Sequence, residues 1–346
     1  MTIDQIPERV FEAYVSLGCP ISMQRIEGGL INKTYLVATS NNQFIIQELS
    51  PIFDVKVIED ANAVAHHLSQ RGINAPKHLL TETGQLYTMV ENRVFRALNY
   101  LEGKSFHTIS SLRMAESSGK VLGGFHEALL DFSYRYQNLR RHGGDYQFHQ
   151  ENLVRALKEH KNHVYFDRVQ TLANSMIEHM EGIVLGLSTT ARHAHGDPKI
   201  SNIIFDDDEQ ANCLVDFDTL GKTGWSLEIA DALRSWCNPN CEDVLDSFVD
   251  LKIAEGALKG YGSVMAGHVT QKEGDEIVKH TQAITLCLAM RYLADVLNEK
   301  YWAYDAKRFE RSSDHNWTRA NAMYHLFGDF AAKQDHIAEM VGDLLL

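Results

Sequence analysis

Two short stretches of sequence decide the fold: HGDPKISNIIF at residues 195–205 and LVDFD at residues 214–218. Each combines a short apolar segment, typical of a strand, with carboxylate or amide side chains at its end. Asp197 lies in the predicted loop between two strands, Asn202 follows it on the same loop, and Asp216 ends the next strand. If the two strands after the loop form a hairpin, their ends lie side by side and these three side chains form one cluster.

This cluster has the composition that phosphoryl transfer to a hydroxyl group requires. Carboxylate and amide oxygens suit Mg²⁺, which takes few protein ligands and fills its shell with water and substrate phosphates. A second carboxylate beside the metal can accept the proton of the attacking hydroxyl. Lys199 can place a positive charge next to the moving phosphoryl group. His195 is interpreted as a structural residue that supports the loop, and Asp206–Asp208 as solvated turn residues.

The first hundred residues predict an antiparallel sheet with two helices. Apolar residues on one stripe predict the longer helix, and a hairpin signal separates two of the strands. The strands are expected at Met23–Glu27, Thr34–Ala38, Phe44–Leu49, Tyr87–Glu91 and Val94–Asn99, and the helices at Pro7–Leu17 and Val55–Gln70. The segment Tyr100–Gly103 is interpreted as a linker.

The rest of the chain is predicted to be mainly helical, with the strand–loop–strand segment inserted in it. Amphipathic segments predict helices at Ser111–Leu130, Glu151–Glu159, Phe166–Leu185, Cys241–Leu258 and Gly274–Asn298. Phe132–Gln150 is the most loop-like stretch. The expected fold class is therefore α+β, with a strand-rich part followed by a helical part.

Composition excludes several classes of function. The chain has 346 residues, and its 33 Lys and Arg against 46 Asp and Glu give a net charge of −13. An acidic chain is a poor ligand for nucleic acid or an anionic membrane, so neither partner is expected. Five scattered cysteines and the absence of an apolar span or a basic leader predict a cytoplasmic protein with reduced thiols. A monomer or a homodimer is expected.

The stretch around Asp197 resembles the catalytic loop of the aminoglycoside phosphotransferase and choline kinase superfamily, which shares the protein-kinase-like bilobal fold. The resemblance implies a nucleotide-binding lobe at residues 1–102 and a catalytic, acceptor-binding lobe at 103–346, with ATP and Mg²⁺ as cofactors and a small molecule as acceptor. It implies Asp197 as catalytic base, with Lys199 assisting, and Asn202 and Asp216 as Mg²⁺ ligands.

The same resemblance assigns nucleotide-binding positions in the first lobe. The run from Gly28 to Tyr35 stands where such kinases carry a phosphate-covering loop, which implies Gly28, Gly29, Asn32 and Thr34 as nucleotide contacts. The adenine is expected beside Asn99 and Leu101. The family usually has a nucleotide-binding lysine on the third strand, paired with a helix carboxylate such as Glu59, but this chain has Gln47 there.

A narrower resemblance, to the N-acetylhexosamine 1-kinase group, covers most of the chain. It rests on the run GLINKTYLV at residues 29–37, the glutamine at the end of the third strand, DPKISN at residues 197–202, and MRYLADVLNEKYW at residues 290–302. It implies an ATP-dependent kinase of the anomeric hydroxyl of an N-acetylhexosamine. Asp197, Asp216, Arg291 and Tyr301 are the implied sugar contacts.

Some of these assignments have competing interpretations. Trp302 is an alternative to Tyr301, and an ion pair between Arg291 and Asp295, four residues apart, is an alternative to sugar contact. The acidic chain also keeps an aminoglycoside, choline or another amino alcohol as possible acceptor. Four carboxylates could then hold ammonium groups or form an ordinary solvated surface: Glu228, Asp231, Glu242 and Asp243. A nucleotide-binding pseudokinase is a further alternative, favoured by Gln47 and opposed by the intact Asp197, Asn202 and Asp216.

Overall fold

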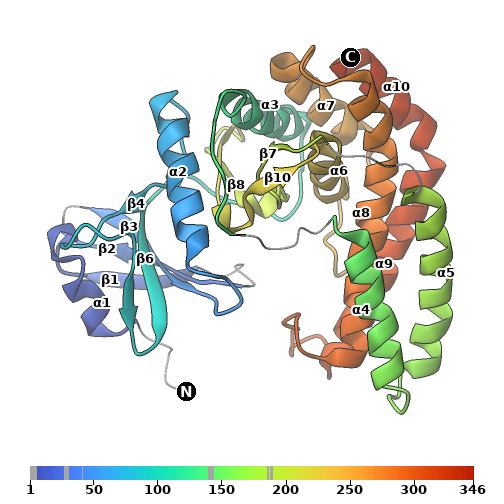
Figure 1. Ribbon diagram of the computed structural model, residues 1–346, viewed down its shortest axis with the longest axis horizontal. Helices are drawn as coiled ribbons and strands as arrows, with labels where there is room; N and C mark the ends of the chain where they lie inside the picture. Colours follow the sequence, from blue (N-terminus) through green and yellow to red (C-terminus); the bar gives the residue numbers. More distant parts are fainter. Residues whose placement is uncertain (1–5, 27–30, 41, 139–143, 185–186, 188–189) are drawn as a thin grey trace. The chain divides into compact units, whose positions relative to one another are not determined.

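The computed structural model describes residues 6–26, 31–40, 42–138, 144–184, 187 and 190–346 (Figure 1). The chain divides into two compact units, neither of which is one continuous stretch. The first comprises Met1–Gly103, Asp131–Leu139 and Val215–Leu220, and the second comprises Lys104–Leu130, Arg140–Leu214 and Gly221–Leu346. Asp197 and Asn202 therefore belong to the second unit, and Asp216 belongs to the first.

The first unit is built on an antiparallel sheet in the order β1-β2-β3-β6-β4, with β5 paired to β6. Alternate residues of the strands, such as Val37 on β2 and Phe44 and Ile46 on β3, are buried against Val10 and Tyr14. The elements are α1 Glu8–Glu12, a 3₁₀ turn at Val15–Leu17, β1 Ser22–Ile26, β2 Lys33–Ala38, β3 Gln43–Leu49, α2 Lys56–Gln70, β4 His78–Leu79, β5 Thr88–Val90 and β6 Arg93–Asn99.

The predicted strands of this sheet and its longer helix lie within about two residues of their expected places; alternating apolar residues mark β2 and β3 in the sequence, and a single apolar stripe marks α2. The helix predicted over Pro7–Leu17 is interrupted. It ends after Glu12, and Tyr14 adopts φ −129° while its ring is buried in the core. The short strand β4 was not predicted.

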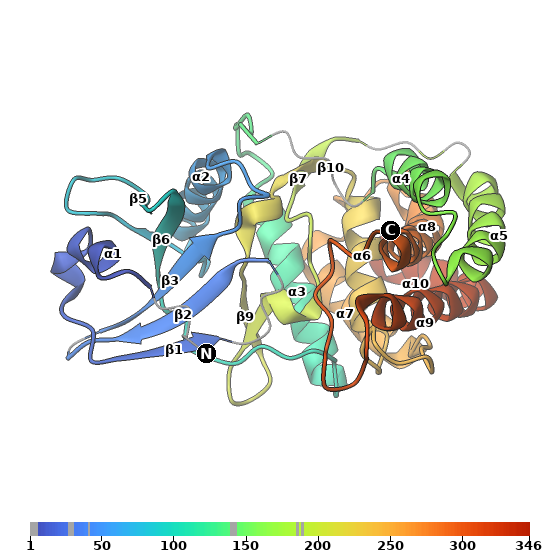
Figure 2. The ribbon, with the colours of Figure 1, turned by 90° about the horizontal axis from the view of Figure 1, so that it is seen from below.

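The second unit is mainly helical. Its long helix α8 (Gln271–Asn298) packs against helices α4 (Tyr146–Glu159), α5 (Phe166–Val184), α6 (Trp225–Trp236), α9 (Ser312–Ala332) and α10 (Gln334–Leu345) (Figure 2). Helices α3 (Leu112–Ala128) and α7 (Leu251–Met265) form a second pair. Their backbones approach so closely that a Cβ atom on Gly260 would lie 1.9 Å from the carbonyl oxygen of Glu116. Glycine is therefore required at this crossing.

Two small antiparallel ribbons carry the strand–loop–strand segment. β7 (Arg192–Ala194) pairs with β10 (Gly221–Thr223), and β8 (Ile203–Phe205) pairs with β9 (Ala211–Leu214). The predicted hairpin is therefore present as β8–β9. Ile203 faces Leu214, and the chain continues from Leu214 through Val215 to Asp216.

Several predictions for the helical part were wrong. The helix expected over Cys241–Leu258 begins only at Leu251, because Asp250 caps it by accepting hydrogen bonds from the backbone N–H groups of Lys252 and Ile253. The end of the loop-like stretch Phe132–Gln150 belongs to α4, which Asp145 caps. Helices α6, α9 and α10 were not predicted. In α9 polar residues are buried as well as apolar ones, so the one-sided apolar stripe that reveals a surface helix is weak there.

No helix within the described residues is long and apolar enough to span a membrane. The five cysteines are free thiols.

Candidate active site

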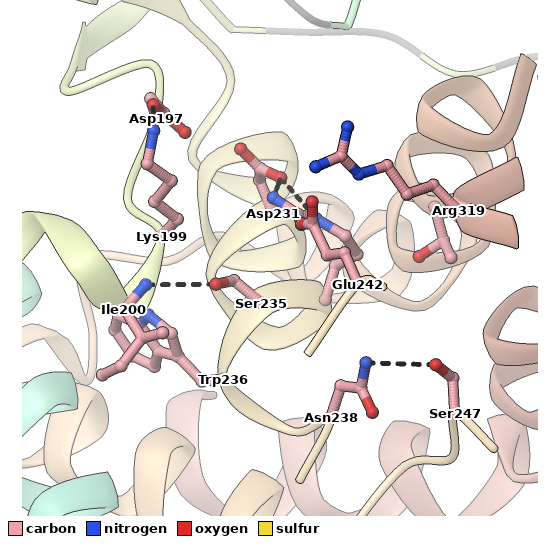
Figure 3. Close-up of polar contacts among 12 residues, drawn as sticks. Asp197, Lys199, Ile200, Asp231, Ser235, Trp236, Asn238, Glu242, Ser247 and Arg319 are labelled. Atoms are coloured by element: carbon pink, nitrogen blue, oxygen red, sulfur yellow. Dashed lines mark hydrogen bonds and ion pairs between the residues drawn. The ribbon is translucent and has the colours of Figure 1, made fainter. Parts of the chain in front are cut away.

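The loop that follows β7 brings Asp197, Lys199 and Asn202 together (Figure 3 shows the first two). Gly196 adopts φ 81°, a left-handed conformation that glycine tolerates best, and so turns the chain into the loop. The Lys199 ammonium lies 2.6 Å from Oδ2 of Asp197. Asn202 donates its side-chain amide to the backbone oxygen of Asp197 at 2.9 Å. The loop is therefore folded around the carboxylate that the sequence predicts as catalytic base.

Helix α6 holds this loop through side chains spaced along one face. The indole N–H of Trp236 donates to the backbone oxygen of Pro198 at 2.8 Å, and the Ser235 hydroxyl accepts from the backbone N–H of Ile200 at 3.1 Å (Figure 3). Each bond fixes the backbone rather than a side chain. The position of Asp197 thus depends on α6.

Glu228 on α6 makes the shortest of these contacts. Its side chain is 2% exposed, and its carboxylate accepts the backbone N–H of His195 at 2.6 Å and that of Gly196 at 3.0 Å. Burial raises the pKa of Glu228, but the neighbouring His126 and His195 and the Gly196 N–H outweigh burial, so the pKa lies below its ordinary value. The carboxylate is therefore ionised and forms charge-assisted hydrogen bonds to the residues that precede Asp197.

The electrostatics of Asp197 suit a base that is ready at neutral pH. Burial alone would raise the pKa of Asp197, but the positive charges of Lys199 and Arg234, together with His195, lower it below its ordinary value. Asp197 is consequently ionised. In a loose phosphoryl-transfer reaction a carboxylate of this kind orients the acceptor hydroxyl and takes its proton late.

A second carboxylate, Asp231 on α6, lies close enough to Asp197 for the two negative charges to interact. Burial raises the pKa of Asp231, Arg234 opposes the rise, and Asp197 adds to it. Arg234 contacts Oδ1 of Asp231 at 2.8 Å and also pairs with Glu242. Within the described part of the chain Oδ2 of Asp231 has no partner. Figure 3 shows Asp231 on α6 and Asp197 on the neighbouring loop.

The four carboxylates of this region do not form an ordinary solvated surface, so that interpretation was wrong. Glu228 is fully buried, and Asp231, Glu242 and Asp243 are partly buried and paired with Arg234 or Arg319. Glu228 and Asp231 lie on α6, and Glu242 and Asp243 lie in the turn between α6 and α7.

In the first unit, Asp216 adopts φ 66°, which is left-handed and costs a non-glycine residue about 1–2 kcal/mol. A 3₁₀ turn at Phe217–Thr219 follows it.

Asp216 and the amide oxygen of Asn202 are hard oxygen donors of the kind Mg²⁺ prefers. The described residues contain no group of three or more His, Cys, Asp or Glu side chains that could hold a metal ion by themselves. Mg²⁺ itself takes few protein ligands and completes its shell with water and substrate phosphates, so it does not require such a group.

The predicted nucleotide contacts of the first unit lie around β2 and β3. The side-chain amide of Gln47 donates to the Thr34 hydroxyl at 3.0 Å, and its oxygen accepts two bonds from Arg96. Asn32 donates to Asp218 at 2.6 Å. Gly28 and Gly29 lie outside the described residues. Gln47 is therefore held by side chains of its own sheet.

Two further predicted nucleotide positions, Asn99 and Leu101, lie at the end of β6 and just after it. Asn99 ends β6, where its side chain accepts the backbone N–H of Lys77 at 2.6 Å, and Leu101 is half-buried in the segment that follows. Glu59, the carboxylate expected to pair with a lysine on β3, accepts instead from the side chain of Gln137 at 2.6 Å.

Arg291, Tyr301 and Trp302 line one cavity of about 220 Å³ in the second unit. The Arg291 guanidinium lies 5.3 Å from the centre of the Trp302 ring, a cation–π arrangement. The alternative ion pair with Asp295 is absent, because the Asp295 carboxylate accepts the backbone N–H groups of residues 300–302 and so shapes the loop. Arg291 and Asp231 both act on the buried Cys287 thiol: burial raises its pKa to about 12, Arg291 opposes the rise and Asp231 adds to it.

Sequence reasoning missed two residues of the site. Arg96 is a cation with buried neighbours on both sides in β6, and Asp218 follows Asp216 within the quoted stretch LVDFD. An isolated charge in an apolar strand is a signal for a buried partner. The partner itself is far away in the sequence.

The family model described as "Phosphotransferase enzyme family" matches residues 22–263, well over half of the chain. The chain belongs to this family. Its fold is protein-kinase-like, with an antiparallel sheet followed by a mainly helical part.

Individual relatives are distant but match over most of their length. The homoserine kinase of Granulibacter bethesdensis is 23% identical over 288 residues, which is 83% of this chain and 85% of the relative. A microcompartment-associated aminopropanol kinase shares the fold with a TM-score of 0.63 and 13% identity over 95% of this chain and 98% of that one. An amicoumacin kinase, solved in complex with AMP-PNP, Ca²⁺ and Ami, has a TM-score of 0.62 and 14% identity over 92% and 93% of the two chains.

Proposed function

We propose that this phosphotransferase is an ATP-dependent kinase of a small hydroxyl compound that carries an amino group. The observation that carries the proposal is Asp231, a largely buried carboxylate next to Asp197 with one oxygen left unpaired in the described structure. Burial and the nearby Asp197 make the negative charge on the Asp231 carboxylate unfavourable. A cationic ligand would therefore stabilise the ionised carboxylate. An ammonium group bound there would bring the rest of the acceptor toward Asp197.

The roles of the other residues follow from their chemistry. Asp197 orients the acceptor hydroxyl and receives its proton, while Lys199 balances the charge of this carboxylate before the reaction. Asn202 and Asp216 are the candidate Mg²⁺ ligands, and a bound Mg²⁺ would neutralise charge on the nucleotide phosphates. Glu228 keeps the loop in place through its backbone. Thr34, Gln47, Asn99 and Leu101, with Gly28 and Gly29, remain the candidate nucleotide positions, whereas the Asn32 side chain is already bonded to Asp218 and to the backbone of Ser50.

The known relatives support an amine-bearing acceptor. Homoserine and aminopropanol are both small hydroxyl compounds with an amino group, and they are the named substrates of two of the proteins compared above. Homoserine also carries a carboxylate, for which Arg291 is a candidate partner. Homoserine is therefore the first acceptor to test.

A second candidate is an N-acetylhexosamine phosphorylated at its anomeric hydroxyl. The cavity lined by Arg291, Tyr301 and Trp302 favours it, because aromatic rings and a guanidinium can stack on a sugar ring and bind its hydroxyl groups. This reading gives the unpaired oxygen of Asp231 no cationic partner, so it accounts for less of the site.

The test is an ADP-release assay with Mg·ATP and a panel of acceptors, with the product identified by mass and by ³¹P NMR. The panel pairs homoserine, aminopropanol, ethanolamine, choline and kanamycin with the uncharged N-acetylglucosamine, N-acetylgalactosamine and glucose. Selective turnover of an amine-bearing compound supports the proposal. Selective turnover of an N-acetylhexosamine, with loss of the reducing end, overturns it in favour of the second candidate.

A further inference from the structure

A buried ion pair lies directly beside Asp216 in the first unit. Arg96 on β6 has a side chain that is 3% exposed, and that of Asp218 is 1% exposed. The Arg96 Nη1 atom lies 2.7 Å from Oδ1 of Asp218, and Nη2 donates to Oδ2 at 2.9 Å. The same guanidinium donates from Nε and Nη2 to the side-chain oxygen of Gln47 at 3.0 and 2.8 Å. Arg96 thus joins β3 to the turn that follows Asp216.

Asn32 is a second hydrogen-bond donor to the Asp218 carboxylate. Its side-chain N–H donates to Oδ2 of Asp218 at 2.6 Å, and its oxygen accepts the backbone N–H of Ser50 at 2.9 Å. Asn32 directly precedes β2, and its side chain is buried. The Asp218 carboxylate consequently accepts hydrogen bonds from two donors, Asn32 directly before β2 and Arg96 on β6.

The backbone next to Asp218 is in an unfavourable conformation that these contacts can hold in place. Asp216 is held at φ 66°, a conformation that a non-glycine residue leaves unless its surroundings impose it. Asp218 sits two residues away, in the 3₁₀ turn at Phe217–Thr219, and fixes that turn to the sheet. Helix α2 also packs on the turn.

We propose that Arg96 and Asn32, acting through Asp218, are positioning residues that keep the Asp216 carboxylate in the orientation needed for the divalent cation of the nucleotide. The inference rests on the proposed function, because it takes Asp216 as a ligand of that cation. Arg96 is not assigned a nucleotide contact, since its charge is already matched by Asp218 and its N–H groups by Gln47. Its effect on nucleotide binding should therefore depend on the metal.

The experiment measures ADP binding by calorimetry to the full chain, with Mg²⁺ and in EDTA, for wild type, Arg96→Gln and Asn32→Ala. The matched control is Arg93→Gln, which removes a cation of the same strand that pairs with Glu48 on β3 at 3.2 Å and lies 30% exposed. Amide hydrogen exchange over residues 215–219 in the nucleotide-free protein gives a second readout that needs no metal.

For Arg96→Gln we expect two quantities to rise about 10–100-fold: the Kd for Mg·ADP and the Mg²⁺ concentration needed for tight ADP binding. Loss of the partners of metal-binding carboxylates has effects of this size. The Kd in EDTA should change by less than about threefold, and exchange over residues 215–219 should accelerate. Asn32→Ala leaves the ion pair intact and should give the same pattern with a smaller rise. Arg96→Gln leaves the buried Asp218 carboxylate without its cation and could prevent folding. In that case Asn32→Ala still tests the inference. Arg93→Gln should leave both Kd values unchanged.

Three results would overturn the inference. Equal loss of affinity with and without Mg²⁺ would show direct contact with the nucleotide or general damage. Unchanged Mg²⁺ dependence in both variants would show that Asp216 is positioned without this network, while the proposed function would stand. A wild-type protein whose ADP binding ignores Mg²⁺ would overturn the proposed function and this inference with it.

Discussion

Replacing Glu228 with glutamine tests whether α6 positions the catalytic loop. In the wild type the ionised carboxylate accepts the backbone N–H groups of both His195 and Gly196. Glutamine keeps the shape but has one acceptor oxygen, so one of these buried N–H groups would face an NH₂ group. A lost hydrogen bond to a charged group costs about 1.5–3 kcal/mol. We therefore expect the free energy of unfolding to fall by about 2 kcal/mol.

The same change should displace the backbone next to Asp197. A small misplacement of a catalytic group costs about 100-fold in rate, so we expect kcat of Glu228→Gln to fall about 10–100-fold. KM for Mg·ATP should change little, because the contacts of Glu228, with the loop and with His126 on α3, lie within the helical unit. Steady-state ADP release and thermal unfolding followed by circular dichroism measure the two effects.

A matched control separates positioning from general damage. Asp329 on α9 also accepts a backbone N–H, that of Val249 at 2.6 Å, and pairs with Lys333, but it has no contact with the Asp197 loop among the described residues. Asp329→Asn should lower stability and leave kcat unchanged. The reasoning is refuted if Glu228→Gln loses stability but keeps its kcat, or if Asp329→Asn loses as much kcat.

The pH dependence of stability gives a further check on Glu228, whose pKa is lowered in the folded protein. A carboxylate with a lowered pKa stabilises the fold above its ordinary pKa of about 4.3, and this contribution disappears as the pH falls through the lower, folded value. The stability difference between wild type and Glu228→Gln should accordingly be constant near neutral pH and vanish in acid.

Three other changes address Asp197, the acceptor and the loop. Lys199→Met removes the charge that lowers the pKa of Asp197, so the acid limb of kcat/KM should move to higher pH; an unmoved limb would show that another group titrates. Asp231→Asn should raise KM for an amine-bearing acceptor by about tenfold or more while KM for Mg·ATP stays constant, since one charge-assisted contact is lost. Equal effects on the two KM values would argue against acceptor contact. Gly196→Ala should cost about 1–2 kcal/mol of stability because its φ is 81°, whereas Gly182→Ala in open space on α5 should be neutral or stabilising; calorimetric unfolding compares them.

Local patterns in the sequence predicted the sheet of the first unit and the strand–loop–strand segment well. Strands β2 and β3 alternate between buried and more exposed residues, and this period of two is visible without any structure. The cluster of Asp197, Lys199 and Asn202 was also accessible, because all three residues lie on one short loop. Where the contacts are local, spacing along the chain was sufficient.

Contacts between distant parts of the chain could not be predicted in this way. Arg96 and Asp218 are separated by 122 residues, and nothing in β6 indicates which carboxylate pairs with its cation. Glu228 was taken for a member of a solvated surface because glutamates on helices usually are exposed. Its burial arises from the packing of α6 beneath β7 and the loop, a tertiary arrangement that helical periodicity does not contain.

The most direct test of the account compares wild type with Asp197→Asn in two assays, ADP release with Mg·ATP and the best acceptor, and binding of Mg·ATP by calorimetry. If Asp197 is the base, Asp197→Asn should lower kcat by about 10²–10⁴-fold, the range that general base catalysis contributes, and leave nucleotide affinity within about threefold of wild type. Retention of kcat in Asp197→Asn would contradict the central claim that phosphoryl transfer in this protein is organised around this carboxylate.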